Sequence, residues 1–495
     1  MCNYGGCNID NYKDWNYCIF HLPKGDVPEE VKQELEKVDK DRIRELERFL
    51  ALDEEDRKRI IEDFNKTLDN YIKEIERKIE EGDETISYNF VGFWFSEANF
   101  GGYKFKKHVN FEVATFSGDA NFSGLFGGTT FSEGANFWYA KFGGNADFEG
   151  AEFSGDADFR YAKFHGNAYF RGAEFSGNAD FQYAKFHGNA YFRGAKFHGA
   201  FASFKMAMFS ENGVADFTQI SIGRNMVLYF TDASIKGIMV FQEIENLRAV
   251  MAGIRIFGNG QIRFIKTGLY YSSFIQVSET EKMSFMGVRW KGEFFDGIVE
   301  EKFFWCTNCS SLFIDTKGEG KFCPLCFIPN KGNRIYRMEK EELYDLMLST
   351  YEFLRENYES HNRHVEAGEF YIMEMDARKK WLKSREKNRW IKRISDWGYT
   401  QMVRAYRWLS LYGESAILPV FWIVMSGIIF ASVFSFTQNM GIFDALSASF
   451  LTLYQNPPLN MPPILALPER LLGLLLNALF ILALNRKFKR RGRAQ

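Results

Sequence analysis

The sequence predicts a multidomain protein organised around a β-solenoid, and a repeat in residues 137–197 is the main reason. Phenylalanine recurs there in steps of five and six that sum to a repeat of eleven. The recurring residues are Phe137, Phe142, Phe148, Phe153, Phe159, Phe164, Phe170, Phe175, Phe181, Phe186, Phe192 and Phe197. Alanine lies two residues before most of these rings. A fixed internal period indicates a solenoid in which each unit buries its apolar face against its neighbours.

The composition of the repeat favours short strands over helix. An eleven-residue period also suits a right-handed helical coiled coil, but a glycine recurs once per repeat. These glycines are Gly155, Gly166, Gly177 and Gly188. Each would destabilise a helix by roughly 1 kcal/mol, whereas Gly, Asn and Asp suit tight corners between short strands.

This pattern resembles the pentapeptide-repeat family, whose unit is A-(D/N)-(L/F)-x-x, in its Phe-rich variant. The resemblance implies a right-handed quadrilateral β-helix with Phe at the inward centre of each face and Ala inward beside it. It covers residues 90–242 clearly and weakens towards residue 292, where Phe264, Phe274 and Phe285 keep irregular spacing. About seven coils of the clear part, stacked at ~4.8 Å, would make a rod of roughly 33 Å.

Length and composition bound the remaining possibilities. A chain of 495 residues is too long for one core, so three or four domains are expected. A net charge of −2 gives no overall field for a nucleic-acid partner. No nucleophile, carboxylate pair or phosphate-binding loop stands out, so an enzyme is not expected. Seven cysteines in two tight clusters indicate metal sites and a reducing compartment rather than disulfides.

The first cysteine cluster has the spacing of a closed zinc site. Cys2, Cys7, Cys18 and His21 form C-x4-C-x10-C-x2-H. Three thiolates and one imidazole are a tetrahedral ligand set for Zn²⁺, with no position left for a reactive water. The segment also resembles the small Cys/His knuckle that precedes some pentapeptide-repeat proteins.

The second cluster consists of two C-x2-C pairs separated by thirteen residues. The pairs are Cys306 with Cys309 and Cys323 with Cys326. This spacing looks like a zinc ribbon, and we expect one Zn²⁺ held by four thiolates as a structural clasp. A redox dithiol is the alternative. The sequence therefore predicts zinc as cofactor, with two structural sites per chain.

Two helical regions flank the solenoid. Residues 27–83 are rich in charge with apolar residues at helical spacing, which predicts two amphipathic helices broken near residues 52–55. Asp53 is placed to cap the second helix, and the pair is expected to cover an exposed end of the solenoid. Residues 336–381 predict a helical hairpin that resembles the linker joining pentapeptide repeats to a membrane pore domain.

The C-terminal region predicts a membrane protein with two spans. Residues 417–436 are an uncharged run of twenty, and residues 471–484 are a second uncharged run that can extend back to Pro468. Lysine and arginine precede the first run and follow the second, so both termini are expected in the cytoplasm and the chain in the cell membrane. Tryptophan and tyrosine among the first basic residues indicate an interfacial helix on the lipid bilayer.

The segment between the spans has the features of a pore loop. Residues 443–454 are too short to cross the bilayer, and the following QNPPLNMPP cannot form regular helix. Irregular backbone at membrane depth survives only where it lines water or is buried in protein. The arrangement is similar to the two-transmembrane potassium-channel fold, which implies a homo-oligomer, by resemblance a tetramer, although another subunit number stays open.

The loop departs from the potassium-channel pattern Thr-x-Gly-Tyr-Gly-Asp, because residues 452–457 contain no glycine. The resemblance therefore does not extend to potassium selectivity. Gln455 and Asn456 would offer carbonyl dipoles at a wider, hydrated constriction. The candidate pore residues are Thr452, Tyr454, Gln455, Asn456 and Asn477.

Two functions follow from this organisation. The first is an oligomeric ion channel with a large cytoplasmic domain, and the second is a membrane-anchored scaffold that binds proteins along the solenoid without conducting ions. The expected domains are a zinc knuckle (1–22), a helical cap (23–86), the β-helix (87–300), a zinc ribbon (301–332), a helical linker with an interfacial helix (333–413), the two spans with their re-entrant loop (414–485) and a basic tail (486–495).

Overall fold

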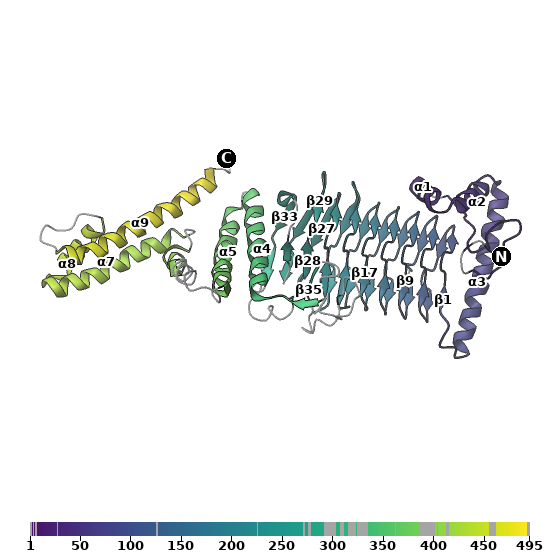
Figure 1. Ribbon diagram of the computed structural model, residues 1–495, viewed down its shortest axis with the longest axis horizontal. Coiled ribbons are helices and arrows are strands. Elements are labelled where there is room, and N and C mark those ends of the chain that lie inside the picture. Colours follow the sequence, from purple (N-terminus) through teal and green to yellow (C-terminus); the bar gives the residue numbers. More distant parts are fainter. Residues whose placement is uncertain are drawn as a thin grey trace. The chain divides into compact units, whose positions relative to one another are not determined.

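The chain forms two units, Met1–Met338 and Glu339–Gln495 (Figure 1). The computed structural model describes residues 2, 4, 7–26, 28–124, 127–224, 226–270, 273–275, 279–291, 303–306, 311–314, 323, 335–361, 363–385, 401–402, 404–411, 415–454 and 462–492.

The first unit contains a parallel β-solenoid with four sheets, one per face. Sheet A consists of β1 (Tyr88–Asn89), β5 (Val109–Asn110), β9 (Ala135–Asn136), β13 (Ala157–Asp158), β17 (Ala179–Asp180), β21 (Phe201–Ser203), β25 (Val227–Tyr229), β28 (Ala249–Ala252) and β32 (Ser273–Ile275). Sheet B consists of β2 (Trp94–Phe95), β6 (Thr115–Phe116), β10 (Lys141–Phe142), β14 (Lys163–Phe164), β18 (Lys185–Phe186), β22 (Met208–Phe209), β26 (Ser234–Ile235) and β29 (Arg255–Ile256).

The other two faces differ in length. Sheet C consists of β3 (Ala98–Asn99), β7 (Ala120–Asn121), β11 (Ala146–Asp147), β15 (Ala168–Tyr169), β19 (Ala190–Tyr191), β23 (Val214–Asp216), β27 (Ile238–Gln242), β30 (Gln261–Ile265) and β33 (Met283–Met286). Sheet D consists of β4 (Lys104–Phe105), β8 (Thr130–Phe131), β12 (Glu152–Phe153), β16 (Glu174–Phe175), β20 (Lys196–Phe197) and β24 (Ser221–Ile222).

The predicted inward rows of phenylalanine and alanine are confirmed. Phe142 pairs in register with Phe164, and Phe164 pairs with Phe186, which sets the coil at 22 residues. The rings of Phe142 and Phe164 stack with centroids 4.9 Å apart and planes within 1°. Ala168 and Ala190 are register partners in sheet C, and both are buried. Because the ring spacing matches the ~4.8 Å between strands, backbone ladders and ring stacks form together.

The solenoid extends further than the regular spacing indicates, with about eight turns. Phe241, Phe264 and Phe285 continue one stack, with centroid distances of 5.0 and 4.9 Å. The irregular spacing has a different consequence, because sheet D ends at Ile222 while sheet C continues to Met286. The fourth face continues less regularly beyond Ile222, because Leu247 forms a parallel bridge with Leu269 of β31, and β31 in turn pairs with β34.

Tyrosine occupies a left-handed corner after sheet A in three successive coils. Tyr139, Tyr161 and Tyr183 have φ values of 56°, 60° and 59°, a region that disfavours bulky residues. Their rings stack outside the solenoid with centroids 4.5 Å apart at both steps. This stacking helps to offset the backbone strain.

The recurrent glycines are required by close packing between coils. A Cβ on Gly166 would lie 2.4 Å from the carbonyl oxygen of Gly144, and one on Gly177 would lie 2.4 Å from the backbone of Gly155. Neither glycine has a positive φ. They therefore permit backbones to approach, which differs from the corner role inferred from sequence.

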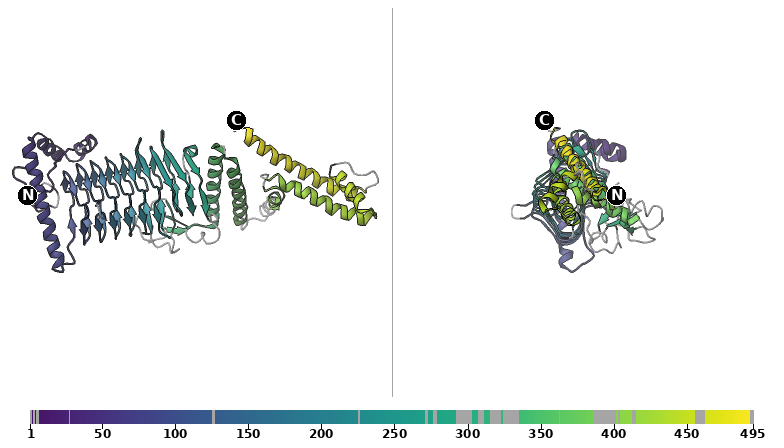
Figure 2. Two further views of the ribbon diagram at one scale, coloured as in Figure 1. Left: turned by 180° about the vertical axis from the view of Figure 1, so that it is seen from behind. Right: turned by 90° about the vertical axis from the view of Figure 1, so that its left-hand side faces the viewer.

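Three helices precede the solenoid: α1 (Glu29–Val38), α2 (Lys40–Leu50) and α3 (Glu54–Glu80). The prediction of two helices was wrong, because Asp39 caps a new helix by accepting from the Arg42 N–H. Asp53 caps α3 as predicted, by accepting from the Asp56 N–H. Figures 1 and 2 show α3 lying across the N-terminal end of the solenoid.

Aromatic contacts join α3 to the first coil. Phe64 meets Phe95 edge-on at 5.5 Å, and Tyr71 Oη donates to the Asn89 carbonyl oxygen at 2.9 Å. Tyr103 Oη donates to Glu76. Apolar burial and the Tyr71 hydrogen bond at this end cover part of the edge of sheet A, where other strands could otherwise add.

A small antiparallel sheet packs on the outside of sheet A. Its strands are β35 (Phe303–Cys306), β36 (Ser311–Ile314) and β37 (Ile335–Arg337). Phe304 and Ile335 are buried in one cluster with Phe201, Tyr229 and Val250. The solenoid also includes β31 (Gly268–Tyr270) paired with β34 (Arg289–Lys291), and a short 3-10 turn, η1 (Thr280–Lys282).

The second unit is helical. It contains α4 (Lys340–Ser360), α5 (His364–Arg385), α7 (Ile417–Gln438), α8 (Ile442–Leu453) and α9 (Pro463–Gly492), and residues 401–402 and 404–410 are also helical. The predicted hairpin of α4 and α5 is confirmed. Arg355 Nε donates to Glu374 Oε2 at 2.9 Å across it, and Tyr358 stacks on Phe370 at 5.3 Å.

Removing one ring from the centre of a stack should destabilise the solenoid. Phe170 lies between Phe148 and Phe192, at centroid distances of 5.0 and 4.9 Å. We expect Phe170→Ala to lower the free energy of unfolding by about 3–5 kcal/mol, because a large cavity forms in a packed core. Thermal unfolding followed by circular dichroism measures this, with the exposed Glu152→Ala as control. Equal unfolding midpoints for the two variants would contradict the stacking account.

The buried carboxyl of Asp180 should make solenoid stability depend on pH. It accepts from the Gln182 backbone N–H at 3.0 Å and lies 3.7 Å from Arg160 Nε. Burial raises the pKa of Asp180 to about 8, whereas an unfolded aspartate has a pKa of about 3.9. The folded state therefore binds the extra proton, and this group destabilises the fold progressively as pH rises from about 4 to about 8.

We expect Asp180→Asn to be more stable than the parent at pH 8, by about 1–3 kcal/mol, and similar to it at pH 4. Unfolding midpoints at the two pH values measure the effect. Asp147→Asn is the matched control, since Asp147 accepts an equivalent backbone hydrogen bond from Glu149 but is only half-buried. A variant that loses stability at pH 8 would show that the charged carboxylate is favourable there.

Candidate metal centre and membrane segments

The N-terminal segment brings three thiols and one imidazole to a single point. Cys18 and His21 lie in one turn, in which the His21 N–H donates to the Cys18 carbonyl oxygen at 3.1 Å. Cys2 joins them because its Sγ accepts from the Cys18 N–H at 3.1 Å. The potential ligand atoms of Cys2, Cys7, Cys18 and His21 all lie within 4.8 Å of one another.

These distances fit a tetrahedral zinc site. Zn–S bonds of about 2.3 Å place two thiolates about 3.8 Å apart and a thiolate about 3.5 Å from an imidazole nitrogen. Cys7 Sγ lies 3.7 Å from Cys18 Sγ. His21 Nδ1 lies 3.7 Å from Cys2 Sγ and 3.0 Å from Cys18 Sγ. The residues therefore suit a closed structural site with no position for substrate.

The solenoid orients the imidazole. His21 Nε2 lies 3.1 Å from the Val91 carbonyl oxygen, so this nitrogen carries the proton and Nδ1 presents its lone pair to the thiols. The ring is stacked on Tyr4 at 4.1 Å and meets Phe93 edge-on at 5.5 Å. The contacts with Val91 and Phe93 of the first coil thus hold the His21 imidazole in the orientation that metal binding requires.

Burial sets the protonation states of these groups. It lowers the pKa of His21 to about 4, so the imidazole is neutral and able to ligate at neutral pH. It raises the pKa of Cys18 to about 12 when no cation is present. A bound Zn²⁺ would displace the thiol protons, and its positive charge would stabilise the thiolates in this buried position.

Lys24 attaches the candidate metal centre to the solenoid. Its Nζ is fully buried and donates to the carbonyl oxygens of Ile19 at 3.0 Å and Leu22 at 2.8 Å. Its own carbonyl oxygen accepts from Trp94 Nε1 and Ser117 Oγ, both at 2.6 Å. This lysine was not singled out from the sequence, because its partners lie up to 93 residues away.

The second cysteine cluster is described in part. Cys306 ends β35, and Cys306 and Cys323 are both buried in the cluster on sheet A. Cys309 and Cys326 lie outside the described residues. The three-stranded sheet of this region includes Cys306, at the end of β35. Its strand β37 lies beyond residue 332, where the sequence predicts the end of the ribbon. The four-thiolate ribbon stays a prediction.

In the described part of the second unit, two helices are long and apolar enough to cross a membrane. They are Ile417–Gln438, with 22 residues, and the Ala466–Asn485 part of α9, with 20 residues. At 1.5 Å per residue each reaches about 30 Å. The second span is longer than the uncharged run in the sequence because it includes Glu469 and Arg470.

The short helix α8 packs against both of these helices through small and polar residues. Ser449 Oγ donates to the Gly427 carbonyl oxygen of α7 at 2.9 Å and is also hydrogen-bonded to Glu469 of α9. A Cβ on Gly473 would lie 2.5 Å from the Leu453 carbonyl oxygen, so α9 approaches the end of α8 closely. Ala445 and Ala448 are buried against Ala431 and Phe434.

The predicted pore residues occupy different environments. Thr452 is fully buried and its hydroxyl donates to the Ala448 carbonyl oxygen at 2.7 Å. Tyr454 is exposed at the C-terminus of α8, and Asn477 is half-buried on α9. Gln455 and Asn456 lie outside the described residues. The sequence analysis did not predict the Ser449–Glu469 contact. The signal for it was an acidic residue within an apolar segment, because such residues usually have a polar partner.

Comparison with protein families identifies the repeats. Residues 125–163 and 159–208 match the family described as Pentapeptide repeats (9 copies). None of the curated proteins compared with the chain matches it. This part of the solenoid therefore consists of pentapeptide repeats, as the resemblance of the sequence pattern implies.

Zinc content should depend on the N-terminal quartet as one unit. We expect Cys18→Ser and His21→Ala each to remove about one equivalent of zinc per chain, because a four-ligand site fails when one ligand is lost. The double variant should lose no more than either single variant. Inductively coupled plasma mass spectrometry of the purified protein gives the stoichiometry. Unchanged zinc in Cys18→Ser would contradict the assignment.

Proposed function

We propose that the chain assembles into a homo-oligomeric membrane pore that carries a large cytoplasmic pentapeptide-repeat domain. The observation that carries the proposal is the packing of α8 between two helices of membrane-spanning length. A helix of 12 residues is about 18 Å long and cannot cross the bilayer. A simple two-helix anchor has no need for such an element, whereas a pore loop does.

The residues at the helix contacts support this arrangement. Without a hydrophobic driving force inside a membrane, helices associate through small residues and interhelical hydrogen bonds. Gly473 provides close approach to α8, and Ser449 hydrogen-bonds to both neighbouring helices. The basic residues outside the two spans favour both termini in the cytoplasm. By resemblance the oligomer is a tetramer.

The ion remains unspecified in this proposal, and strong potassium selectivity is not part of it. The rings of carbonyl oxygens that replace the water around K⁺ need glycine at positions of positive φ. Residues 452–457 contain no glycine. We expect a wider constriction at which ions keep part of their hydration, so that Na⁺ and K⁺ permeate similarly.

A membrane-anchored scaffold is the second candidate. The tyrosine ladder favours it, since stacked aromatic side chains on a rigid surface suit protein contacts. It is formed by Tyr139, which is exposed, and by Tyr161 and Tyr183, which are half-buried. In that case the solenoid would bind partners, and the helices would serve only to hold it at the membrane.

Reconstitution in planar bilayers distinguishes the two candidates. The purified oligomer should give discrete current steps, with reversal potentials near zero under opposing Na⁺ and K⁺ gradients. Gly473→Leu should abolish the currents, because a larger side chain would displace α8 from α9. Leu474→Val is the matched control, since Leu474 is exposed on the same helix. Electrical silence of intact parent oligomers across voltage, pH and membrane tension would overturn the pore.

A further inference from the structure

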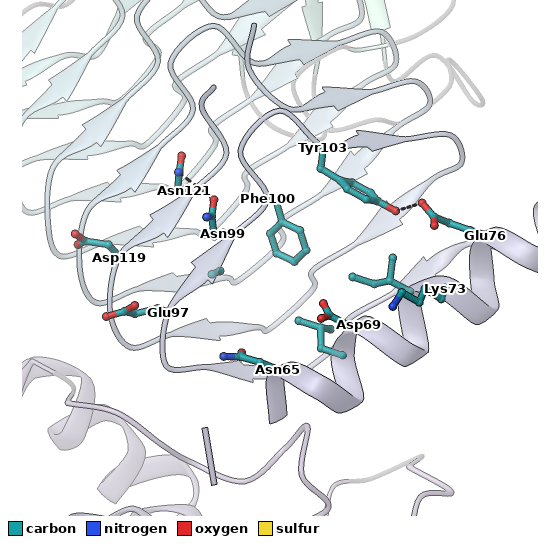
Figure 3. Close-up of a pocket in the computed structure, with 13 residues that line it drawn as sticks. Asn65, Asp69, Lys73, Glu76, Glu97, Asn99, Phe100, Tyr103, Asp119 and Asn121 are labelled. Atoms are coloured by element: carbon teal, nitrogen blue, oxygen red, sulfur yellow. Dashed lines mark hydrogen bonds between the residues drawn. The ribbon is translucent and has the colours of Figure 1, made fainter. Parts of the chain in front are cut away.

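A groove of about 670 Å³ lies between α3 and the first coil of the solenoid (Figure 3). Leu68, Ile72 and Phe100 contribute its apolar surface, and Glu97 and Asn99 come from the end of sheet C. Neither the candidate metal centre nor the membrane helices take part in it. The groove therefore needs an explanation of its own.

The groove exposes an unpaired edge of β3. The Ala98 N–H donates to the Asp119 carbonyl oxygen, and the Phe100 N–H donates to the Asn121 carbonyl oxygen, so both point to the next coil. Backbone groups alternate in direction along a strand. The N–H and C=O of Asn99 and the C=O of Glu97 thus point away from the solenoid. Within the described part of the chain these three groups have no hydrogen-bond partner.

Some edge groups of sheets A and B at this end of the solenoid are capped, in contrast to the three groups of β3. In sheet A the Asn89 carbonyl oxygen accepts from Tyr71 Oη at 2.9 Å. In sheet B the Trp94 N–H donates to the Phe20 carbonyl oxygen at 2.7 Å. The same helix and knuckle that cover sheets A and B leave β3 facing the groove.

The charges around the groove indicate which kind of ligand it would bind. Asp69, Glu97 and Asp119 line it together with Glu76, and Lys73 is the one cation among its lining residues. Glu76 already accepts from Tyr103 Oη (Figure 3). Carboxylates and edge carbonyl oxygens all accept hydrogen bonds, so a cationic occupant rich in N–H donors is complementary. The apolar surface suits the aliphatic stems of arginine and lysine.

We propose that this groove binds an extended segment of a partner protein that carries arginine or lysine. The segment would add as a strand to the free edge of β3, with main-chain pairing to Asn99 and Glu97. Alternate side chains of a strand point to opposite sides, so cationic side chains at every second position would meet Asp69, Glu97 and Asp119. The interaction is independent of ion conduction, and it places protein recognition at the end of the solenoid.

The test uses the full chain in detergent micelles and three fluorescein-labelled peptides. The first, acetyl-RVRVRVR-amide, should bind saturably in fluorescence anisotropy, and acetyl-EVEVEVE-amide should not bind. The third has the first sequence with N-methyl groups on alternate backbone nitrogens, and we expect it to bind at least about tenfold more weakly because edge pairing is blocked. The protein variant Asp69→Lys/Glu97→Lys should also weaken the first peptide at least about tenfold.

Matched controls separate this groove from general electrostatics. Glu149→Lys/Glu152→Lys reverses the same number of charges at exposed solenoid positions outside the groove and should leave binding within about twofold. Circular dichroism should show that both double variants remain folded. Equal loss of affinity in the two double variants would overturn the proposal, as would undiminished binding of the N-methylated peptide. Spermidine that displaces the peptide completely at equal charge concentration would instead assign the groove to small polyamines.

Discussion

Ring-on-ring stacking of phenylalanine between successive coils is the contact on which the solenoid depends. Along sheet B the stack runs from Phe95 to Phe209 with centroid separations between 4.8 and 5.1 Å. Since strands also repeat at ~4.8 Å, one spacing satisfies ring packing and backbone hydrogen bonding together. The other features follow from it: small alanines fill the space beside the rings, and Gly166 permits the backbones to approach. The rings stay in register although successive partners in this stack are 21 residues apart from Phe95 to Phe116 and 26 apart from Phe116 to Phe142, so the connections between strands accommodate the extra residues.

The ends of such a solenoid expose unpaired strand edges, and different elements of the chain pack on different parts of it. At the N-terminal end α3 and the candidate metal centre cover sheets A and B, with Lys24 buried between them. A zinc ion there would add to the stabilisation that the buried Trp15, Phe20 and Leu22 give this segment. Farther along the chain the fourth face continues as the separate pair β31 and β34, and the small sheet of β35, β36 and β37 packs on sheet A. The cover at the N-terminal end leaves β3 open, and this opening defines the acidic groove.

The sequence was most informative where structure is local or periodic. The eleven-residue repeat predicted a solenoid, and its resemblance to pentapeptide repeats implied the inward Phe and Ala rows. Asp53 predicted the start of α3, and the spacing of Cys2, Cys7, Cys18 and His21 predicted a cluster that the fold brings together. It did not predict features that depend on contacts between segments far apart in the chain. Asp39 was not recognised as a cap because the charged pattern continues on both sides of it. Glu469 acquires its buried position from Ser449, 20 residues away on another helix, and the roles of Lys24 and the open β3 edge depend on partners farther still.

We propose that these elements act together as an oligomeric membrane pore that carries a rigid repeat domain with a protein-binding end. The pore is the central claim, because α8 has no explanation in a plain anchor. The most direct measurement is a cryo-electron microscopy map of the purified oligomer viewed along its symmetry axis. The account predicts a continuous lumen on that axis, bordered by α8 and α9 of each subunit. A map in which the helices form a closed bundle without a lumen, or separate as monomers, would contradict it.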